Sequence, residues 1–225
     1  MTFQVCAFGS DGVVLASDLQ MSTPGGTNSI VEKIVISEDR LLAVATAGIH
    51  RLTVDATEEL LSLWNDHAPL GEYMLGLLAD KVVWRYCGRL PATPKAGDEV
   101  IRSRMLILNV RSLELFDVWL GPKSTANRHT KGYVVSGDAH NLAAFFIARY
   151  ASNSKPPLPL HKLIPIVAHA TLMASRINPS AVGGLEVAVY ENSALRKLTD
   201  TEINDLIDSS ESLDGEIAQK FGTTP

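Results

Sequence analysis

The chain has 225 residues, of which 46% are hydrophobic and 20% charged, and these proportions exclude wholesale disorder. Its 20 lysines and arginines against 25 aspartates and glutamates give a net charge of −5, which argues against general nucleic-acid binding. The two cysteines, Cys6 and Cys87, form no disulfide framework or zinc motif, and no apolar run reaches the roughly 18 residues of a membrane span. We expect one domain over residues 1–225, in a reduced cytoplasmic protein with no cofactor, no metal, no nucleic acid and no membrane partner.

Short β-branched and aromatic runs between turn residues predict two hairpins in the first 47 residues. Phe3–Phe8 runs through a Gly-Ser-Asp-Gly turn into the returning strand Val13–Asp18. Met21–Ser29 contains proline and two glycines and is predicted to be a loop. Lys33–Ser37 and Leu41–Ala47 form the second hairpin, and their near-continuous apolar character predicts a sheet that is covered on both faces.

The rest of the chain alternates pairs of helices with pairs of strands. Apolar residues at helical spacing predict helices at 52–64, 70–87, 139–150 and 160–176, and a short acidic helix after residue 200. Strands are predicted at 105–110, 113–119, 132–136, 185–190 and 194–198, with a loop at 90–98. The alternation in 113–119 predicts a half-exposed strand. This order favours an α+β fold, with two antiparallel sheets packed together and helices on both outer faces.

Common catalytic and nucleotide-binding motifs are absent. The chain has no phosphate-binding glycine loop, no H-E-x-x-H and no G-x-S-x-G. Its six histidines do not cluster along the sequence, so we assign them to packing or solvated positions rather than to a metal site.

The N-terminus carries the most informative chemistry. Met1 is followed by Thr2, and a small second residue permits removal of the initiator methionine. Thr2 would then offer a hydroxyl nucleophile and, in its α-amine, a base with an ordinary pKa of about 7.7–8.0.

Five segments give this N-terminus a family context. Residues 9–18, 32–36, 41–48, 134–138 and 183–189 resemble the corresponding motifs of proteasome β-type subunits, which are N-terminal-nucleophile hydrolases. A chain that starts directly at Met-Thr resembles the simpler bacterial relatives in this group, and we identify it as a bacterial proteasome-related peptidase. The resemblance implies a four-layer αββα sandwich of the Ntn-hydrolase type.

The resemblance also implies five site residues. Thr2 would be the nucleophile, and the Lys33 ammonium would lie beside its hydroxyl although Lys33 comes one residue earlier than the family spacing. Asp18 would pair with Lys33 and keep it charged. The Gly48 backbone N–H would donate to the oxyanion, and Ser136 would help to position the amine and a proton-relay water.

One segment departs from the family pattern. Active members carry an aspartate and a second serine before the late strand, and these two residues support the N-terminal amine. In this chain Pro179 and Val182 occupy those positions and offer no polar side chain. Ser180 or Asn178 could substitute for them.

The resemblance implies a peptide or unfolded-protein substrate, a homo-oligomeric ring and a possible unfoldase partner. Phe145 and Phe146 could bury surface between subunits, although core packing is the commoner reason for such residues. We expect the pocket for the substrate side chain near residues 46–54. Thr46, Ile49 and Thr53 would make it small to medium and uncharged.

Three alternatives remain open at this point. The chain could be a catalytically inactive structural or interaction protein that keeps the sandwich, as Pro179 and Val182 would favour. It could be an Ntn amidohydrolase or transpeptidase with a narrow substrate, which monomeric behaviour would favour. A nucleophile at Cys6 is a third reading, against which its position within a strand argues.

Overall fold

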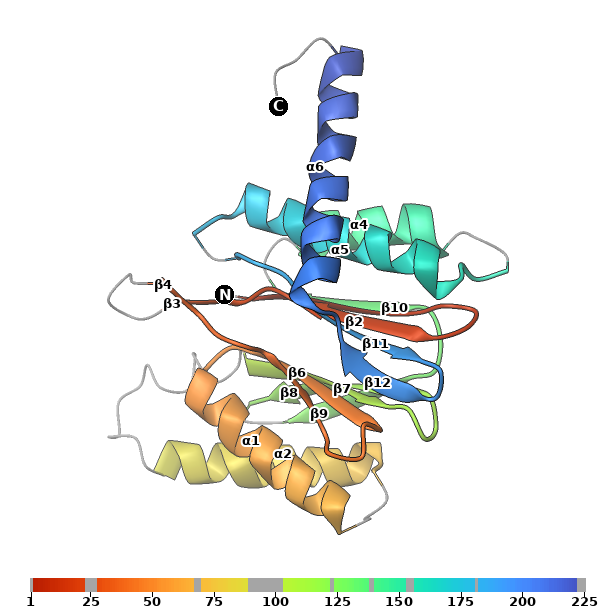
Figure 1. The fold of residues 1–225 in the computed structure, drawn as a ribbon. Helices are drawn as coiled ribbons and strands as arrows, with labels where there is room; N and C mark the ends of the chain where they lie inside the picture. Colours follow the sequence, from red (N-terminus) through yellow and green to blue (C-terminus); the bar gives the residue numbers. More distant parts are fainter. Residues whose placement is uncertain are drawn as a thin grey trace.

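Two five-stranded antiparallel sheets and the helices that cover them make up the fold (Figure 1). The computed structural model describes residues 2–22, 28–66, 70–88, 103–121, 124–137, 140–152, 156–180 and 182–221. The mixed α/β content expected from the sequence, with antiparallel sheets and helices, is confirmed. In the described ranges no helix is both long and apolar enough to cross a membrane.

The first sheet has the strand order β10-β1-β2-β11-β12 and carries the N-terminus. Its strands are β1 (Phe3–Phe8), β2 (Val13–Ser17), β10 (Tyr133–Gly137), β11 (Glu186–Glu191) and β12 (Ala194–Lys197). The sequential hairpin β1–β2 lies at its centre, and the later strands β10 and β11 add to its two sides.

The second sheet has the order β5-β6-β7-β8-β9 and is a meander in which each strand pairs with the next. Its strands are β5 (Ile34–Ile36), β6 (Leu42–Ala47), β7 (Ser103–Asn109), β8 (Glu114–Leu120) and β9 (Thr125–His129). A separate pair, β3 (Gln20–Ser22) and β4 (Asn28–Ile30), projects beside the N-terminus (Figure 1).

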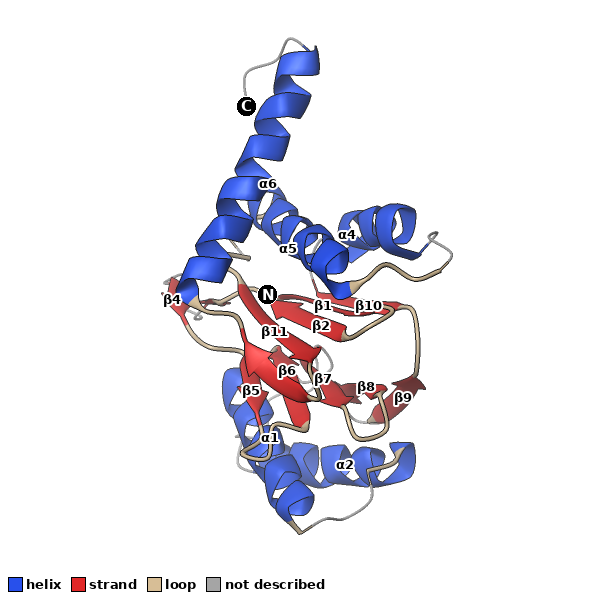
Figure 2. Ribbon diagram, turned by 45° about the vertical axis from the view of Figure 1, so that its right-hand side comes forward, coloured by secondary structure: helices blue, strands red, loops and turns tan. Residues whose placement is uncertain are grey.

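Helices flank the sheets on opposite sides (Figures 1 and 2). Helices α1 (His50–Asn65) and α2 (Glu72–Gly88) lie against the second sheet. Helices α4 (His140–Ile147) and α5 (Leu160–Ile177) lie against the first, and a π-helical turn η1 (Ala148–Ser152) follows α4. Helix α6 (Asp200–Phe221) starts next to β12, crosses α5 and extends beyond the body of the fold.

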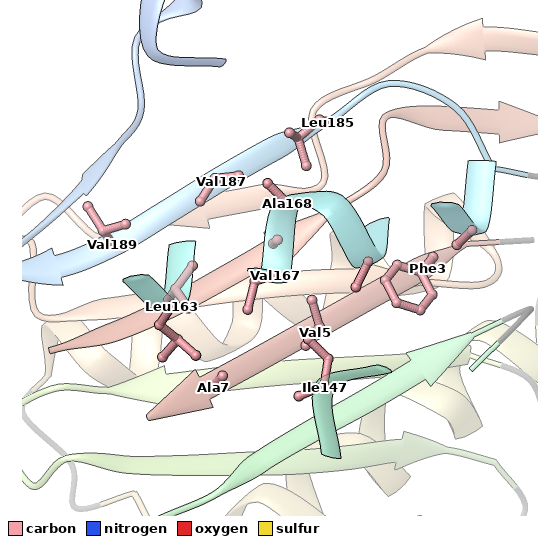
Figure 3. Packing of buried hydrophobic residues seen from close by; sticks show 14 of the residues in the cluster. Phe3, Val5, Ala7, Ile147, Leu163, Val167, Ala168, Leu185, Val187 and Val189 are labelled. Atoms are coloured by element: carbon pink, nitrogen blue, oxygen red, sulfur yellow. The ribbon is translucent and has the colours of Figure 1, made fainter. Parts of the chain in front are cut away.

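Three apolar clusters follow from this layering. One joins α4 and α5 to the first sheet, and Phe3, Val5, Val167 and Val187 are among its members (Figure 3). A second joins α1 and α2 to the second sheet, and a third lies between the sheets. Both sheets are therefore covered on both faces, as the apolar strands predict. The ends of β1, β5 and β6 that carry the candidate residues are consequently held by packing on two sides.

Several details differ from the sequence-based expectation. The loop expected at Met21–Ser29 is strand at both ends, because Gln20–Ser22 and Asn28–Ile30 pair as β3 and β4, and its residues 23–27 lie outside the described residues. β9 was not predicted because Thr125–His129 has no apolar pattern. The strand expected to be half-exposed, β8, is mostly buried because its polar residue Asp117 forms a buried ion pair with Arg104. The acidic C-terminal helix is long, at 22 residues. The loop expected at residues 90–98 lies outside the described residues.

Candidate active site

Thr2 lies immediately before β1, where the backbone is fixed from two directions. The Phe3 N–H donates to Asp18 Oδ1 at 2.9 Å. On the other side Gly137 of β10 packs against the Thr2 carbonyl so closely that a Cβ at Gly137 would overlap the carbonyl oxygen. Gly137 also has φ +102°, so only glycine suits this position without strain. Thr2 is thereby held in the lining of a pocket, and the residue is only 7% exposed.

Lys33 reaches the Thr2 hydroxyl. Its Nζ atom lies 2.9 Å from Thr2 Oγ1, 2.8 Å from Asp18 Oδ1 and 2.5 Å from the Gln20 carbonyl oxygen. These three acceptors match the three N–H donors of an ammonium group. The one-residue difference in spacing therefore does not prevent the contact expected between Lys33 and Thr2.

Asp18 is fully buried and accepts four hydrogen bonds. Oδ1 accepts from Phe3 N–H and Lys33 Nζ, and Oδ2 accepts from Gln20 N–H at 3.0 Å and Gly183 N–H at 3.4 Å. A carboxylate with this set of donors is fixed in orientation. Asp18 therefore links β1, β2, the Lys33 side chain and the segment before β11.

Two opposing effects act on the pKa of Lys33. Burial lowers the pKa of its ammonium group from the usual 10.5, and the nearby charges of Asp18 and Glu186 offset only part of that effect. A positive charge in a poorly solvated position acts strongly on its neighbours. The Thr2 hydroxyl, 2.9 Å away, therefore lies in the field of a weakly screened positive charge.

Gly48 lies at the end of β6, on the rim of the same pocket. It has φ +103°, and a Cβ there would come within 2.5 Å of both Cα and Oγ of Ser103. Ser103 Oγ also accepts a hydrogen bond from the Ile49 N–H at 3.0 Å. Ser103 thus fixes the turn that leads from β6 into α1.

The pocket next to Thr2 is small, with a volume of about 50 Å³. Thr2, Lys33 and Gly48 line it together with seven others: Gln20, Met21, Val31, Thr46, Ala47, His50 and Thr53. The lining predicted from residues 46–54 is thus found in part. Ile49 is not part of it and packs against the cluster under the second sheet, while His50 takes a place in the lining.

Ser136 takes a different position from the other four candidate residues. It lies in β10 opposite Gln4, next to Gly137, and it is buried. In the described part of the chain it does not line the pocket and no hydrogen bond joins it to Thr2. The structure therefore brings together Thr2, Asp18, Lys33 and Gly48, with Ser136 on the neighbouring strand.

Pro179 and Val182, which depart from the family pattern, lie between α5 and β11. The Val182 side chain is fully buried in the cluster between the first sheet and α5. Ser180 is exposed, and its hydroxyl donates to Asn178 Oδ1 at 2.9 Å. The segment still reaches the site through its backbone, because the Ser180 carbonyl accepts from Gln20 Nε2 at 2.8 Å.

Cys6 is fully buried between the sheets, and burial raises the pKa of its thiol far above the usual range. The thiolate needed for attack is therefore not formed near neutral pH, and the reading of Cys6 as nucleophile is wrong. In the described ranges no group of three or more His, Cys, Asp or Glu side chains is placed to hold a metal ion.

Three residues that contribute to the site were not predicted from the sequence. Gln20 supplies a carbonyl acceptor to Lys33 and a side chain to the pocket, His50 lines the pocket, and Glu186 binds the Lys33 backbone. Only Glu186 carried a signal, as an acidic residue directly before the apolar run Val187–Val189.

Comparison with known proteins identifies the fold. No protein-family model and no curated protein matches the chain. Among solved structures it is similar to Anbu (ancestral beta-subunit) from Yersinia bercovieri, with a TM-score of 0.74 and 16% identity over 99% of this chain and 98% of that one. It is also similar to an Anbu (Gly-1) mutant from Hyphomicrobium sp. strain MC1, with a TM-score of 0.69 and 12% identity over 100% of this chain and 98% of that one.

These neighbours correct the family assigned from sequence motifs. Anbu proteins are proteasome-like but distinct from proteasome β-type subunits, so the identification of the chain as a bacterial proteasome-related peptidase of that family is wrong. The chain has the proteasome-like fold of the Anbu proteins.

Proposed function

We propose that the chain is an N-terminal threonine hydrolase that cleaves peptide bonds, built as a four-layer αββα sandwich of the Ntn-hydrolase type. Removal of Met1 would make Thr2 the first residue and its hydroxyl the nucleophile. The observation that carries this proposal is the position of Lys33 Nζ, 2.9 Å from Thr2 Oγ1 and 2.8 Å from the buried Asp18 carboxylate, at the edge of a pocket.

The chemistry would proceed by acyl transfer. The Thr2 α-amine takes the proton from Oγ1, directly or through a water molecule, while Oγ1 bonds to the scissile carbonyl carbon. The carbon–nitrogen bond then breaks, and the proton held by the amine passes to the departing nitrogen. Water attacks the resulting ester, again with the amine as base, and returns the free threonine.

The other residues would act on charge and position. The Lys33 ammonium favours the alkoxide form of Oγ1, and Asp18 keeps Lys33 oriented. The Gly48 N–H would stabilise the oxyanion, an interaction that contributes about 2.7–4 kcal/mol in other hydrolases. Ser136, one residue before Gly137, would act on the amine through a bound water rather than by direct contact.

The substrate class follows from the pocket and the proposed assembly. A pocket of about 50 Å³ suits a small side chain at the cleavage site. We place the chain in a cytoplasmic homo-oligomeric ring that admits peptides or unfolded proteins, with an unfoldase as a possible further partner. The exposed Phe145 on α4 is surface that another copy could cover.

The experiment is hydrolysis of a panel of short fluorogenic peptides with small, large, acidic and basic residues before the cleaved bond. Thr2→Ala is the test variant, and Thr125→Ala, an exposed threonine on β9, is the matched control. Thr2→Ala should lower kcat/KM by about 10³-fold or more while the control keeps it, because the substitution removes the nucleophile. Equal rates in Thr2→Ala and Thr125→Ala would overturn the proposal.

One observation favours a second candidate, a non-catalytic binding protein with this fold. Val182 stands where an amine-supporting hydroxyl was expected, and it is fully buried in the core. Failure of every peptide in the panel, together with retention of Met1, would support this candidate.

A further inference from the structure

Glu186 is a buried carboxylate at the start of β11, 7% exposed, in a strand whose neighbouring residues are apolar. In the first sheet it lies in one register row with Ser17, Gln4 and Ser136, across four strands. A buried carboxylate costs several kcal/mol unless it is bonded. Its partners therefore indicate what it does.

The partners on one side are backbone groups of the second sheet. Glu186 Oε2 accepts from the Lys33 N–H at 2.8 Å and from the Ile34 N–H at 3.0 Å. β11 and β5 belong to different sheets (Figure 2), so this carboxylate ties the start of β5 to the sheet that carries Thr2. Lys33 is thus held at its backbone by Glu186 and at its Nζ atom by Thr2, Asp18 and Gln20.

The partner on the other side is Lys197 of β12. Its Nζ atom lies 2.5 Å from Glu186 Oε1 and 2.8 Å from Glu32 Oε2. Burial would lower the pKa of Lys197, but its bonds to Glu186 and Glu32 outweigh that effect, and the pKa is raised. Lys197 therefore stays charged and partly neutralises Glu186 over the working pH range.

These groups define the charges around the Lys33 ammonium. Asp18 contacts it directly, Glu186 acts on it from beyond its backbone, and Lys197 and Glu32 modulate Glu186. His50 is the other titratable side chain among the described residues that line the pocket.

We propose that Glu186 is a positioning residue of the Thr2 site, which anchors the backbone of Lys33 and supplies a negative charge that keeps its side chain an ammonium group. The inference rests on the proposed function for its catalytic consequence. It goes beyond that function because Glu186 touches neither Thr2 nor the pocket and acts only through Lys33.

The test compares Glu186→Gln with Glu191→Gln. Both substitutions remove one charge from the same strand, but Glu191 pairs with Arg196 at 2.6 Å and does not contact Lys33. Glutamine at position 186 keeps a carbonyl oxygen for the two backbone N–H groups, so the loss of charge is separated from the loss of the anchor. The readouts are the pH titration of the Lys33 ¹³Cε NMR signal and the pH profile of kcat/KM.

Glu186→Gln should move the Lys33 titration midpoint to lower pH by about one unit, because removing a nearby negative charge favours the neutral amine. The alkaline limb of kcat/KM should shift in the same direction. Glu191→Gln should leave both unchanged. Equal midpoints in the two variants would overturn the inference.

A second variant should shift the Lys33 titration midpoint in the opposite direction. Lys197→Met removes the positive charge beside Glu186, so the Lys33 midpoint should rise. The variant must also unfold at the same guanidinium concentration as the wild type, because exposure of Lys33 to solvent would raise its pKa as well. This arm also decides the inference if Glu186→Gln does not fold. A midpoint that falls or stays fixed in Lys197→Met contradicts it.

The NMR titration of Lys33 tests the role of Glu186 independently of the proposed function. If the wild-type chain hydrolyses no peptide, the proposed function fails, and the direction of the Lys33 shifts still decides whether Glu186 controls that charge. If peptides are hydrolysed but the shifts are absent, the proposed function stands and the role of Glu186 is refuted.

Discussion

Replacing Asp18 by asparagine tests the electrostatic centre of the site. The carboxylate is fully buried, and each of its oxygens accepts from two donors. An asparagine side chain has one oxygen and one NH2 group, so in either orientation an NH2 group faces two donors. One orientation opposes Phe3 N–H and Lys33, and the other opposes Gln20 N–H and Gly183 N–H.

The magnitude follows from these contacts. A buried donor that loses its acceptor costs about 1–3 kcal/mol, and breaking a buried ion pair from one side costs about 3–5 kcal/mol. We therefore expect Asp18→Asn to lower the free energy of unfolding by about 3–5 kcal/mol. Part of that cost comes from the Lys33 ammonium, which is left buried without its carboxylate.

The assay is guanidinium-induced unfolding of Asp18→Asn, Lys33→Met and the double variant. Asp208→Asn on the exposed face of α6 is the matched control, with an expected change within about 0.5 kcal/mol. Because both variants break the same pair, the double variant should be less destabilised than the sum of the two by at least about 1 kcal/mol. Additive single changes, or a cost below about 1 kcal/mol for Asp18→Asn, would refute the reasoning.

Three further predictions concern the frame of the site and the pH dependence. Gly48→Ala should lower the free energy of unfolding by about 1–3 kcal/mol, because the position has φ +103° and no room for a Cβ. Gly76→Ala, in an open helical position, is the control and should leave that free energy unchanged or raise it in the same unfolding assay. Arg196 lowers the pKa of Glu202 from 4.5 to about 2, so this pair stabilises the fold above pH 4.5 and its contribution is lost as pH falls towards 2. In thermal melts from pH 2 to 7, the melting temperature of Glu202→Gln should therefore fall less on acidification than that of the wild type. Gln4 is fully buried with no hydrogen-bond partner for its amide among the described residues, so Gln4→Leu should keep or raise the melting temperature, and a fall of several degrees would show that the amide is bonded.

Local patterns were sufficient to predict most strands and helices. The hairpin of β1 and β2 and the apolar faces of α1 and α5 follow from turn residues and periodicity in a single stretch of chain. β9 was missed because its residues Thr125–His129 pair only along one edge of a sheet, and their polarity gives no strand signal. Asp117 in β8 was wrongly predicted to be exposed, because its ion pair with Arg104 forms only when β8 pairs with the neighbouring strand β7.

In the candidate site too, local motifs were predicted from the sequence and long-range contacts were not. Thr2, Asp18, Lys33 and Gly48 could be proposed because each stands in a short recognisable motif near the N-terminus. Glu186 could not, since its bond to the Lys33 backbone joins residues 153 positions apart and depends on how the two sheets meet. His50 lines the pocket and Ile49 does not, because of the direction in which α1 leaves Gly48. The sequence pattern does not determine that direction.

The central claim is that Thr2 acts as a free N-terminal nucleophile. The most direct test is the intact mass of the purified, untagged protein. The account predicts a mass that is short by one methionine, with Thr2 at the N-terminus and its amine free. A mass that includes Met1 would contradict it, because the amine that must take the proton from Oγ1 would then be part of a peptide bond.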